Sequence, residues 1–471
     1  MKNNRRDFIR KTSMAGLGLA GTSLIQAKET SEIQTYQPKS QKQHFNMSGY
    51  AAPKINTVRV GVIGLGSRGP GAVNRLSKIE GVEIKALCDI LPERVEKVKA
   101  SLEGTAHNPD LYSGSAMIWK KVCERDDLDL IYVVTPWDWH TPMCLYAMEN
   151  DKHAACEVPI ATTLEECWQL VETSERTKKH CVMMENCCYD FFELLTLNMV
   201  RQGYFGEIVH CEGAYIHDLL DLNFRKNGYA DMWRLEENAS RNGNLYTTHG
   251  LGPICWAMDI NRGDKMEYLN SMSSADFMMR DHAMDLAEED PFYNRWASKT
   301  YRGNMNTTCI RTHKGRTIML QHDVTSPRPY SRIHLISGTK GVARKWPLPG
   351  KIAQGHDWVS QEEFKELEEK YTPEIVQKVG DMARQIGGHG GMDFIMDWRM
   401  IDCLRNGLPM DNDVYDGALW SAISPLSEAS VANRSNSVEV PDFTRGAWKD
   451  NDPVNLSLQG AGTTKVIGSR E

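Results

Sequence analysis

The chain has 471 residues, which is too long for one domain and comfortable for two. Its net charge of −7 and the lack of a basic block in the body of the chain argue against nucleic-acid binding. No apolar run reaches transmembrane length, and the twelve cysteines form no CxxC pair, so we expect no membrane span, buried free thiols and no metal site.

Residues 1–27 have the features of a twin-arginine signal peptide. The segment Asn4–Lys11 carries paired arginines and a phenylalanine, a weakly apolar stretch continues to Ile25, and Ala27 is a suitable cleavage point. This order favours export, to the periplasm or by secretion, over an amphipathic or disordered tail. Residues 28–57 are polar and predict a linker or an arm, and the sequence leaves both open.

The next stretch has the organisation of a dinucleotide-binding βαβ unit. A β-branched run at 58–63 predicts a buried parallel strand, and it is followed by a complete G-x-G-x-x-G, which reads Gly64-Leu65-Gly66-Ser67-Arg68-Gly69. A helix, a strand at 82–88 and then Asp89 complete the pattern. The glycines admit a pyrophosphate at a helix N-terminus, and the carboxylate binds a ribose diol. Asp89 favours NAD over NADP because it repels a 2′-phosphate, whereas Arg68 and Arg94 keep NADP open.

Strands and helices continue to alternate as far as Asn186, which predicts a doubly wound parallel sheet over residues 58–186. Helices are expected at 92–102, 113–125, 141–150 and 164–179, and strands at 128–134, from 153 and at 181–185. Ligands bind at the carboxyl ends of such strands, where turn or capping chemistry is the competing interpretation for any single residue. The polar and aromatic candidates at these ends are Trp137, Asp138, His140, Glu157, Asn186 and Tyr189.

Residues 187–471 show a different pattern. A strand is expected at 209–217, a hairpin at 308–312 and 317–321, a further pair of strands from 333, and helices at 392–405 and 414–433. This predicts an α+β domain with a largely antiparallel, open-faced sheet, whose C-terminal helices return to the core of an α/β protein. The exposed face of the sheet leads us to expect a homodimer.

Six sequence blocks resemble glycoside hydrolase family 109, the NAD-dependent α-N-acetylgalactosaminidases. That family lies within the glucose–fructose oxidoreductase/inositol dehydrogenase/rhizopine catabolism superfamily. The blocks are Pro136–His140, Leu164–Trp168, Glu185–Tyr189, Gly243–Gly250, Arg328–Tyr330 and Gly388–Asp393.

The chain departs from the dehydrogenases of that superfamily at informative positions. Val158 stands where they carry a lysine, and His249 and Pro253 stand where they carry an Asp and a His. Thr247 replaces a proline of family 109 itself. The set of residues typical of net sugar oxidation is therefore largely missing.

The resemblance implies a glycosidase cycle in which NAD oxidises the sugar at C3, the C2 proton is removed, the C1 leaving group is eliminated, water adds and C3 is reduced again. It places His249 at the C3 hydroxyl and Tyr189 as the C2 base, with exchange of the two roles left open. The residues expected to bind NAD are Gly64, Gly66, Ser67, Arg68, Asp89, Trp137, Asp138, Trp139, His140, Glu157, Val158 and Asn186. Those expected to bind sugar are Tyr215, Arg234, Tyr246, Thr247, Thr248, His249 and Tyr330.

Competing interpretations stay open at this stage. Tyr215 could be a packing residue, Arg234 a surface ion pair and His389 only a cap. The whole chain could instead be a sugar oxidoreductase with exchangeable NAD, which Val158 disfavours, or a non-catalytic sugar-binding protein that retains NAD. The expected partner is a carbohydrate, whose identity and anomeric linkage the sequence does not fix.

Overall fold

The computed structural model describes residues 42–468, so the predicted signal peptide and residues 28–41 lie outside the described residues. The described part of the polar segment lies on the body of the protein. Met47 is buried, the amide of His44 donates to Glu175 Oε2 at 3.0 Å, and the amide of Ile55 donates to the carbonyl of Leu404 at 3.0 Å. These residues therefore pack as an arm against the folded chain.

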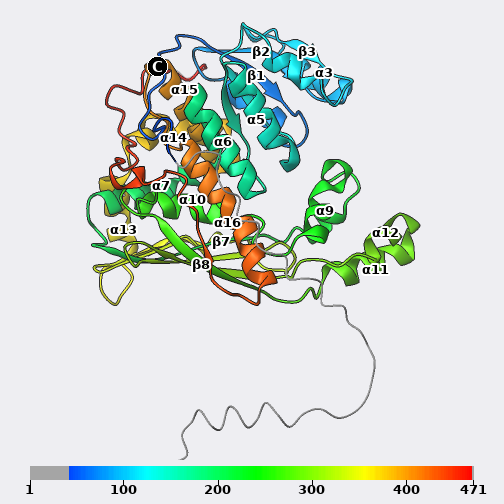
Figure 1. The fold of residues 1–471 in the computed structure, drawn as a ribbon. Helices are drawn as coiled ribbons and strands as arrows, with labels where there is room; N and C mark the ends of the chain where they lie inside the picture. The colour runs from blue at the N-terminus through cyan, green and yellow to red at the C-terminus, as the bar shows by residue number, and fades with distance from the viewer. Residues whose placement is uncertain (1–41, 469–471) are drawn as a thin grey trace, which may run out of the picture. The chain divides into compact units, whose positions relative to one another are not determined.

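The first sheet is parallel and has six strands in the order β3-β2-β1-β4-β5-β6. The strands are β1 (Val58–Ile63), β2 (Val82–Cys88), β3 (Asp110–Tyr112), β4 (Leu130–Val133), β5 (His153–Cys156) and β6 (Cys181–Met183). The helices between them are α2 (Gly69–Leu76), α3 (Pro92–Ala100), α4 (Trp119–Cys123), α5 (His140–Glu149) and α6 (Leu164–Thr177) (Figure 1). The predicted doubly wound sheet is confirmed. Helix α4 is shorter than expected because the residues around Gly114, whose φ is +84°, form turns.

The second sheet has eight strands in the order β13-β12-β11-β7-β10-β9-β8-β14. They are β7 (Ile208–Ile216), β8 (Met266–Ser273), β9 (Asn306–Thr312), β10 (Thr317–Asp323), β11 (Leu335–Gly338), β12 (Val342–Arg344), β13 (Lys351–Ala353) and β14 (Val438–Glu439). Only β7 and β10 pair in parallel, and the other neighbours are antiparallel. The expected largely antiparallel sheet is thus confirmed.

Helix α10 (Thr248–Ala257) crosses β7 at very short range. A Cβ atom on Gly250 would lie 2.5 Å from the amide nitrogen of Ala214, and one on Gly213 would lie 2.4 Å from the carbonyl oxygen of Gly250. Only glycine permits this approach, which places the N-terminus of α10 directly above the sheet.

The C-terminal helices connect the two sheets. Helix α15 (Met392–Asn406) packs on α2 and β1, and Asp397 accepts hydrogen bonds from Arg75 Nε at 2.6 Å and the Tyr132 hydroxyl at 2.8 Å. Helix α16 (Val414–Ala432) contacts both α6 and β8, and in Figure 1 it runs from the first sheet to the second. Beyond these helices, Val466 forms a β-bridge with Ile79, which lies between α2 and β2, so the last described residues pack against the domain of the first sheet.

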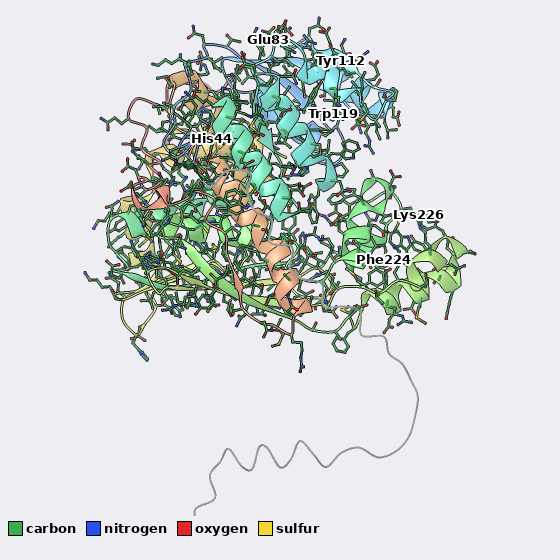
Figure 2. All side chains as sticks on the ribbon, viewed as in Figure 1. His44, Glu83, Tyr112, Trp119, Phe224 and Lys226 are labelled. Carbon is green, nitrogen blue, oxygen red and sulfur yellow. The ribbon has the colours of Figure 1, made fainter. Side chains whose placement is uncertain are left out.

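A small helical extension stands beside the second sheet. It contains α8 (Leu220–Phe224), α9 (Trp233–Ser240), α11 (Met279–Glu289) and α12 (Asn294–Ala297), and Figure 2 shows Phe224 and Lys226 within it. Its own apolar cluster includes Leu235, Met279 and Trp296. The remaining helices are α7 (Phe191–Arg201), α13 (Gln361–Tyr371) and α14 (Glu374–Ile386). Within residues 42–468, no helix is long and apolar enough to cross a membrane.

Candidate active site

The turn between β1 and α2 fits a dinucleotide. Gly64 has a φ of +97°, and a Cβ there would lie 2.5 Å from the carbonyl oxygen of Val134. A Cβ on Gly69 would lie 2.1 Å from the carbonyl oxygen of Gly64, so the turn closes tightly. A Cβ on Gly66 would instead have room, since its nearest neighbour would be Arg94 Nη1 at 3.6 Å, and the neighbouring Ser67 is exposed. This leaves backbone open at the N-terminus of α2, where a pyrophosphate binds.

Asp89 lies at the carboxyl end of β2 and holds the glycine turn. Its Oδ2 accepts from the amide of Leu65 at 2.7 Å, its Oδ1 accepts from the amide of Leu91 at 3.0 Å, and Arg94 Nη1 is 3.5 Å from Oδ1. A carboxylate can accept about four hydrogen bonds, so Asp89 retains capacity for a ribose diol while it fixes the turn.

The residues after β4 separate into different roles. Trp137 is buried, and its ring packs 5.1 Å from that of Trp233 and 6.0 Å from that of Tyr246. Asp138 and Trp139 are exposed, and the Trp139 ring lies 6.5 Å from Trp119. Of these three expected cofactor residues, the structure therefore brings Trp137 to the aromatic group and leaves its two neighbours outside it.

His140 is buried, with its ring nitrogens against main-chain carbonyls. Nδ1 lies 2.6 Å from the carbonyl oxygen of Pro159, and Nε2 lies 2.7 Å from that of Thr135. With both nitrogens used in this way, His140 positions the loops after β4 and β5, and its expected contact with the cofactor stays a prediction.

Arg68 joins the glycine turn to the ends of other elements. Its Nε donates to Glu157 Oε1 at 3.0 Å, and its Nη1 lies 3.4 Å from Asp393 Oδ2. Asp393 also accepts from Asn186 Nδ2 at 2.5 Å. Burial would raise the pKa of Asp393, but a hydrogen bond from His389 and the charges of Arg68 and Arg75 hold that pKa well below its usual range. The expected Arg68, Glu157 and Asn186 thus belong to one network.

His249 and Glu185 form a buried pair at the N-terminus of α10. His249 Nδ1 lies 2.7 Å from Glu185 Oε1 and 3.0 Å from Oε2, and Glu185 has no exposed surface. Burial would raise the pKa of Glu185, but the neighbouring His249 and hydrogen bonds hold it below its usual value. Because a carboxylate only accepts, Nδ1 carries the proton, and Nε2 keeps a lone pair in the neutral ring.

Aromatic rings surround the other side of His249. Its ring lies 4.9 Å from that of Tyr246 and 5.5 Å from that of Tyr215, and the two tyrosine rings are 4.4 Å apart. Tyr330 lies 6.2 Å from Tyr215. Burial raises the pKa of Tyr215 to about 12, and nearby Arg234 opposes that shift.

Arg234 lies inside this aromatic group, so its interpretation as a surface ion pair is wrong. Its guanidinium is 4.6 Å from the ring of Tyr229, 5.2 Å from those of Trp233 and Tyr246, and 5.4 Å from that of Trp137. Its Nη1 donates to the Tyr229 hydroxyl at 2.9 Å. A cation held mainly by ring faces keeps donors available for a polar ligand.

Thr247 and Thr248 lie at the start of helix α10. Thr247 Oγ1 donates to the carbonyl of Trp420 at 2.6 Å, and Thr248 is buried beside Glu185. The Thr247 hydrogen bond fixes the helix that carries His249, and the expected sugar contacts of both threonines stay predictions.

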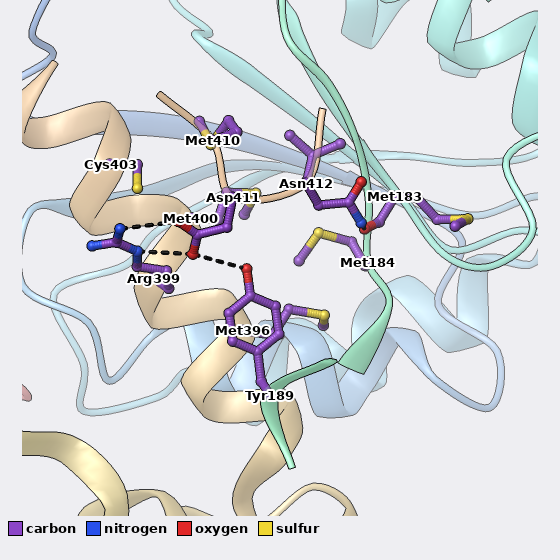
Figure 3. Close-up of a pocket in the computed structure, with 11 residues that line it drawn as sticks. Met183, Met184, Tyr189, Met396, Arg399, Met400, Cys403, Met410, Asp411 and Asn412 are labelled. Carbon is purple, nitrogen blue, oxygen red and sulfur yellow. Dashed lines mark hydrogen bonds and ion pairs between the residues drawn. The ribbon is translucent and has the colours of Figure 1, made fainter. Parts of the chain in front are cut away.

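The structure does not bring Tyr189 to this group. It lies in a short turn of helix over Asn186–Tyr189, and its hydroxyl donates to Asp411 Oδ2 at 3.2 Å, as Figure 3 shows. Asp411 is also paired with Arg399, and methionines such as Met396 line the small cavity around them. Burial raises the pKa of Tyr189 well above its ordinary value. The Tyr189 hydroxyl therefore contacts Asp411 in this structure, and its expected role as the C2 base stays a prediction.

Several residues of the site, including Glu185, Tyr229 and Trp233, lie outside the set expected from sequence. Glu185 stands in the block that also contains Asn186, and its place just after a buried strand is the signal that could have found it. Trp233 precedes Arg234 on α9, but nothing in the local pattern distinguishes it from a packing residue. Val158, buried at the end of β5, presents an aliphatic side chain here.

Glu185, Cys187 and His249 bring three potential metal ligands within 4.8 Å of one another. Burial raises the pKa of the Cys187 thiol well above its ordinary value. Glu185 is already paired with His249 Nδ1 at 2.7 Å, an arrangement that suits proton transfer.

Fold and site together define a nicotinamide-dinucleotide protein whose second half supplies an aromatic, histidine-containing site. Residues 58–185 match the oxidoreductase family with an NAD-binding Rossmann fold, and residues 189–450 match the C-terminal domain of glycosyl hydrolase 109. The chain belongs to glycosyl hydrolase family 109, and NAD is its cofactor.

Relatives support the family assignment, and a solved structure shows a similar fold. The chain is 47% identical to a glycosyl hydrolase family 109 protein of Porphyromonas gingivalis, over 92% of this chain and 95% of the relative. It is 45% identical to one of Shewanella pealeana, over 97% and 99%. Its fold is similar to that of scyllo-inositol dehydrogenase from Lactobacillus casei, with a TM-score of 0.57 at 13% identity, covering 82% of this chain and 99% of that one.

The position of Asp89 predicts that its loss weakens NAD retention. Asp89→Ala removes the acceptor for two turn amides and for the ribose, so we expect binding to weaken by roughly 1–3 kcal/mol. Asp89→Asn, which keeps one acceptor oxygen, should lose less, and Asp126→Ala at an exposed turn should change nothing. The measurement is the NAD content of purified protein, and equal content in all four proteins would contradict this role.

Proposed function

We propose that this protein is a glycosidase that cleaves N-acetylgalactosaminide-type glycosides by an NAD-dependent oxidation–elimination–hydration–reduction cycle. The observation that carries the proposal is the Glu185–His249 pair, at 2.7 Å, facing Tyr215 and Tyr246 beside a Rossmann edge. At that edge Val158 takes the place of the lysine that a net dehydrogenase would use.

Bound NAD supplies a hydride acceptor and later returns the hydride, so no second substrate is consumed. The chain's own residues handle the protons. His249, oriented through Nδ1 by Glu185, offers Nε2 as the base that takes the C3 hydroxyl proton and later returns it. General bases of this kind need such a fixed tautomer.

Tyr246 is the residue we assign to the C2 proton in place of Tyr189. It lies next to His249, and Arg234 is 5.2 Å from its ring. Burial raises the pKa of Tyr246 well above its ordinary value, while the charge of Arg234 acts in the opposite direction. A carbonyl at C3 makes the C2 proton acidic, and Arg234 can balance the negative charge as that proton leaves.

The second candidate function is a sugar oxidoreductase that releases reduced cofactor. The fold shared with inositol dehydrogenases favours it, whereas the aliphatic Val158 opposes it. A panel of α- and β-linked N-acetylgalactosaminides, N-acetylglucosaminides, galactosides and glucosides, assayed without added NAD, separates the two. Net oxidation requires external NAD for turnover, but the proposed cycle does not.

Hydrolysis in heavy water should place deuterium at C2 of the released sugar. The C2 proton passes to a side-chain base that exchanges with solvent, whereas the C3 hydrogen does not pass through water and should be retained. Mass spectrometry and NMR of the product measure both positions. Product without label at C2, together with no primary isotope effect on C2-deuterated substrate, would rule out the elimination mechanism.

Glu185→Gln should lower kcat while leaving KM nearly unchanged. Glu185 is fully buried and acts through His249, so the loss of one charged hydrogen bond, about 1.5–3 kcal/mol, corresponds to roughly 10–100-fold. Glu185→Asp should recover part of this loss, and His249→Ala should cost about 10²–10⁴-fold.

Glu165→Gln, on the exposed face of α6, is the matched control for these measurements. A rise in KM with kcat unchanged in Glu185→Gln would show that Glu185 does not act through the catalytic histidine.

We also propose that the protein is exported through the twin-arginine pathway and pairs as a homodimer through the outer face of the second sheet. Arg5→Lys combined with Arg6→Lys should retain the protein in the cytoplasm, because the receptor recognises the arginine pair. Cell fractionation tests this, and normal periplasmic accumulation would contradict it.

Sedimentation velocity tests the proposed homodimer, which a single monomeric species would exclude.

A further inference from the structure

The segment that joins α14 to α15 has an unusual backbone. All five residues from Gly387 to Gly391 have positive φ values, and the single side chain among them, His389, has a φ of +46°. Glycine is required at two of these positions, since a Cβ on Gly388 would lie 2.7 Å from Asp393 Cβ and one on Gly391 would lie 2.9 Å from the main chain of Ala383. This backbone presents one side chain at a fixed place.

His389 contacts the glycine turn of the cofactor site. Its Nδ1 donates to Asp393 Oδ2 at 2.9 Å, so Nε2 keeps the lone pair and lies 3.4 Å from Arg68 Nη1, and its side chain is 53% exposed. Arg68 immediately precedes α2, at the end where the pyrophosphate binds. A segment more than 300 residues away in sequence is therefore attached to the phosphate end of the dinucleotide site.

Glu157, Asp393 and His389 each contact Arg68 from a different part of the chain. Glu157 holds Nε from the end of β5 at 3.0 Å, and Asp393 lies 3.4 Å from Nη1 in the first turn of α15. Asp393 is itself fixed by Asn186 and Arg75, which leaves His389 as the exposed and replaceable member. Loss of His389 would leave Arg68 Nη1 with only the ion pair to Asp393.

We propose that residues 387–391 form a latch on the NAD site, in which His389 is a positioning residue that holds Arg68 across the phosphate end and slows release of the dinucleotide. The latch explains how an enzyme that uses its NAD as a recycled group retains it between turnovers. It concerns the cofactor alone and does not depend on which sugar is cleaved.

The test is the rate at which holoenzyme exchanges bound NAD for isotopically labelled NAD, followed by mass spectrometry without any sugar. His389→Gly removes the side chain and suits the positive φ, so it should accelerate exchange by about 10- to 100-fold, the scale of a lost charged hydrogen bond. His389→Ala should do the same. His389→Asn, which tolerates this φ and keeps an acceptor, should restore slow exchange.

His356→Gly, in the exposed loop before α13, is the matched control and should exchange as the unaltered protein does. Thermal unfolding of each variant checks the fold, and His389→Ala serves if His389→Gly is unstable. Unchanged exchange in both variants would overturn the latch. Fast exchange in His389→Gly but not in His389→Ala would also overturn it, because this would assign the effect to the backbone. So would equally fast exchange in His389→Asn, because a side chain that keeps the acceptor would then fail to hold Arg68. Because no glycoside is present, a failure of the proposed hydrolysis would leave this result unaffected.

Discussion

The pair between Glu185 and His249 is the interaction on which the site depends, because its two members come from different halves of the chain. Glu185 follows the last strand of the parallel sheet, and His249 begins the helix that crosses the second sheet. The two side chains are in direct contact, so removal of either one would change the surroundings of the other. A buried carboxylate without a partner would cost several kcal/mol, so the pair also fixes how the two layers meet.

The close crossing of α10 over β7 makes this pairing geometrically possible. With glycine at positions 213 and 250, the helix lies low on the sheet and contacts the short helix Asn186–Tyr189 that follows β6. Thr247 then ties the start of the helix to α16, which itself contacts both sheets. The aromatic group around Arg234 is assembled against this fixed helix and is closed by Trp233 from α9. Main-chain packing thus fixes the place of α10, the Thr247 hydrogen bond fixes its first turn, and that turn carries His249.

Much of the fold could be predicted because its signals are local. The strands at 58–63 and 82–88 match the structure residue for residue, since apolar and β-branched residues predominate in both and turn residues bound them. The helical extension could not be predicted in the same way. Its helices are short, as in the four residues of α12, and their apolar positions become a core only when they meet one another.

The candidate site was predicted less completely, for a related reason. Resemblance brought together Tyr215, Arg234, Tyr246 and His249, which do converge. It also selected Tyr189, whose hydroxyl instead bonds to Asp411, a partner 222 residues away. The sequence shows where a side chain leaves a strand but not the direction in which it turns, and that direction depends on distant partners.

The return of the chain's end to the first layer has a consequence for synthesis on the ribosome. Ile79 forms its bridge with Val466, and Trp398 Nε1 donates to the carbonyl of Thr464 at 3.1 Å. The βαβ unit is translated early, but it reaches its final packing only after Thr464 and Val466 have left the exit tunnel. Although domains of long chains commonly fold in order from the N-terminus, this arrangement delays completion of the nucleotide-binding half until those residues are available.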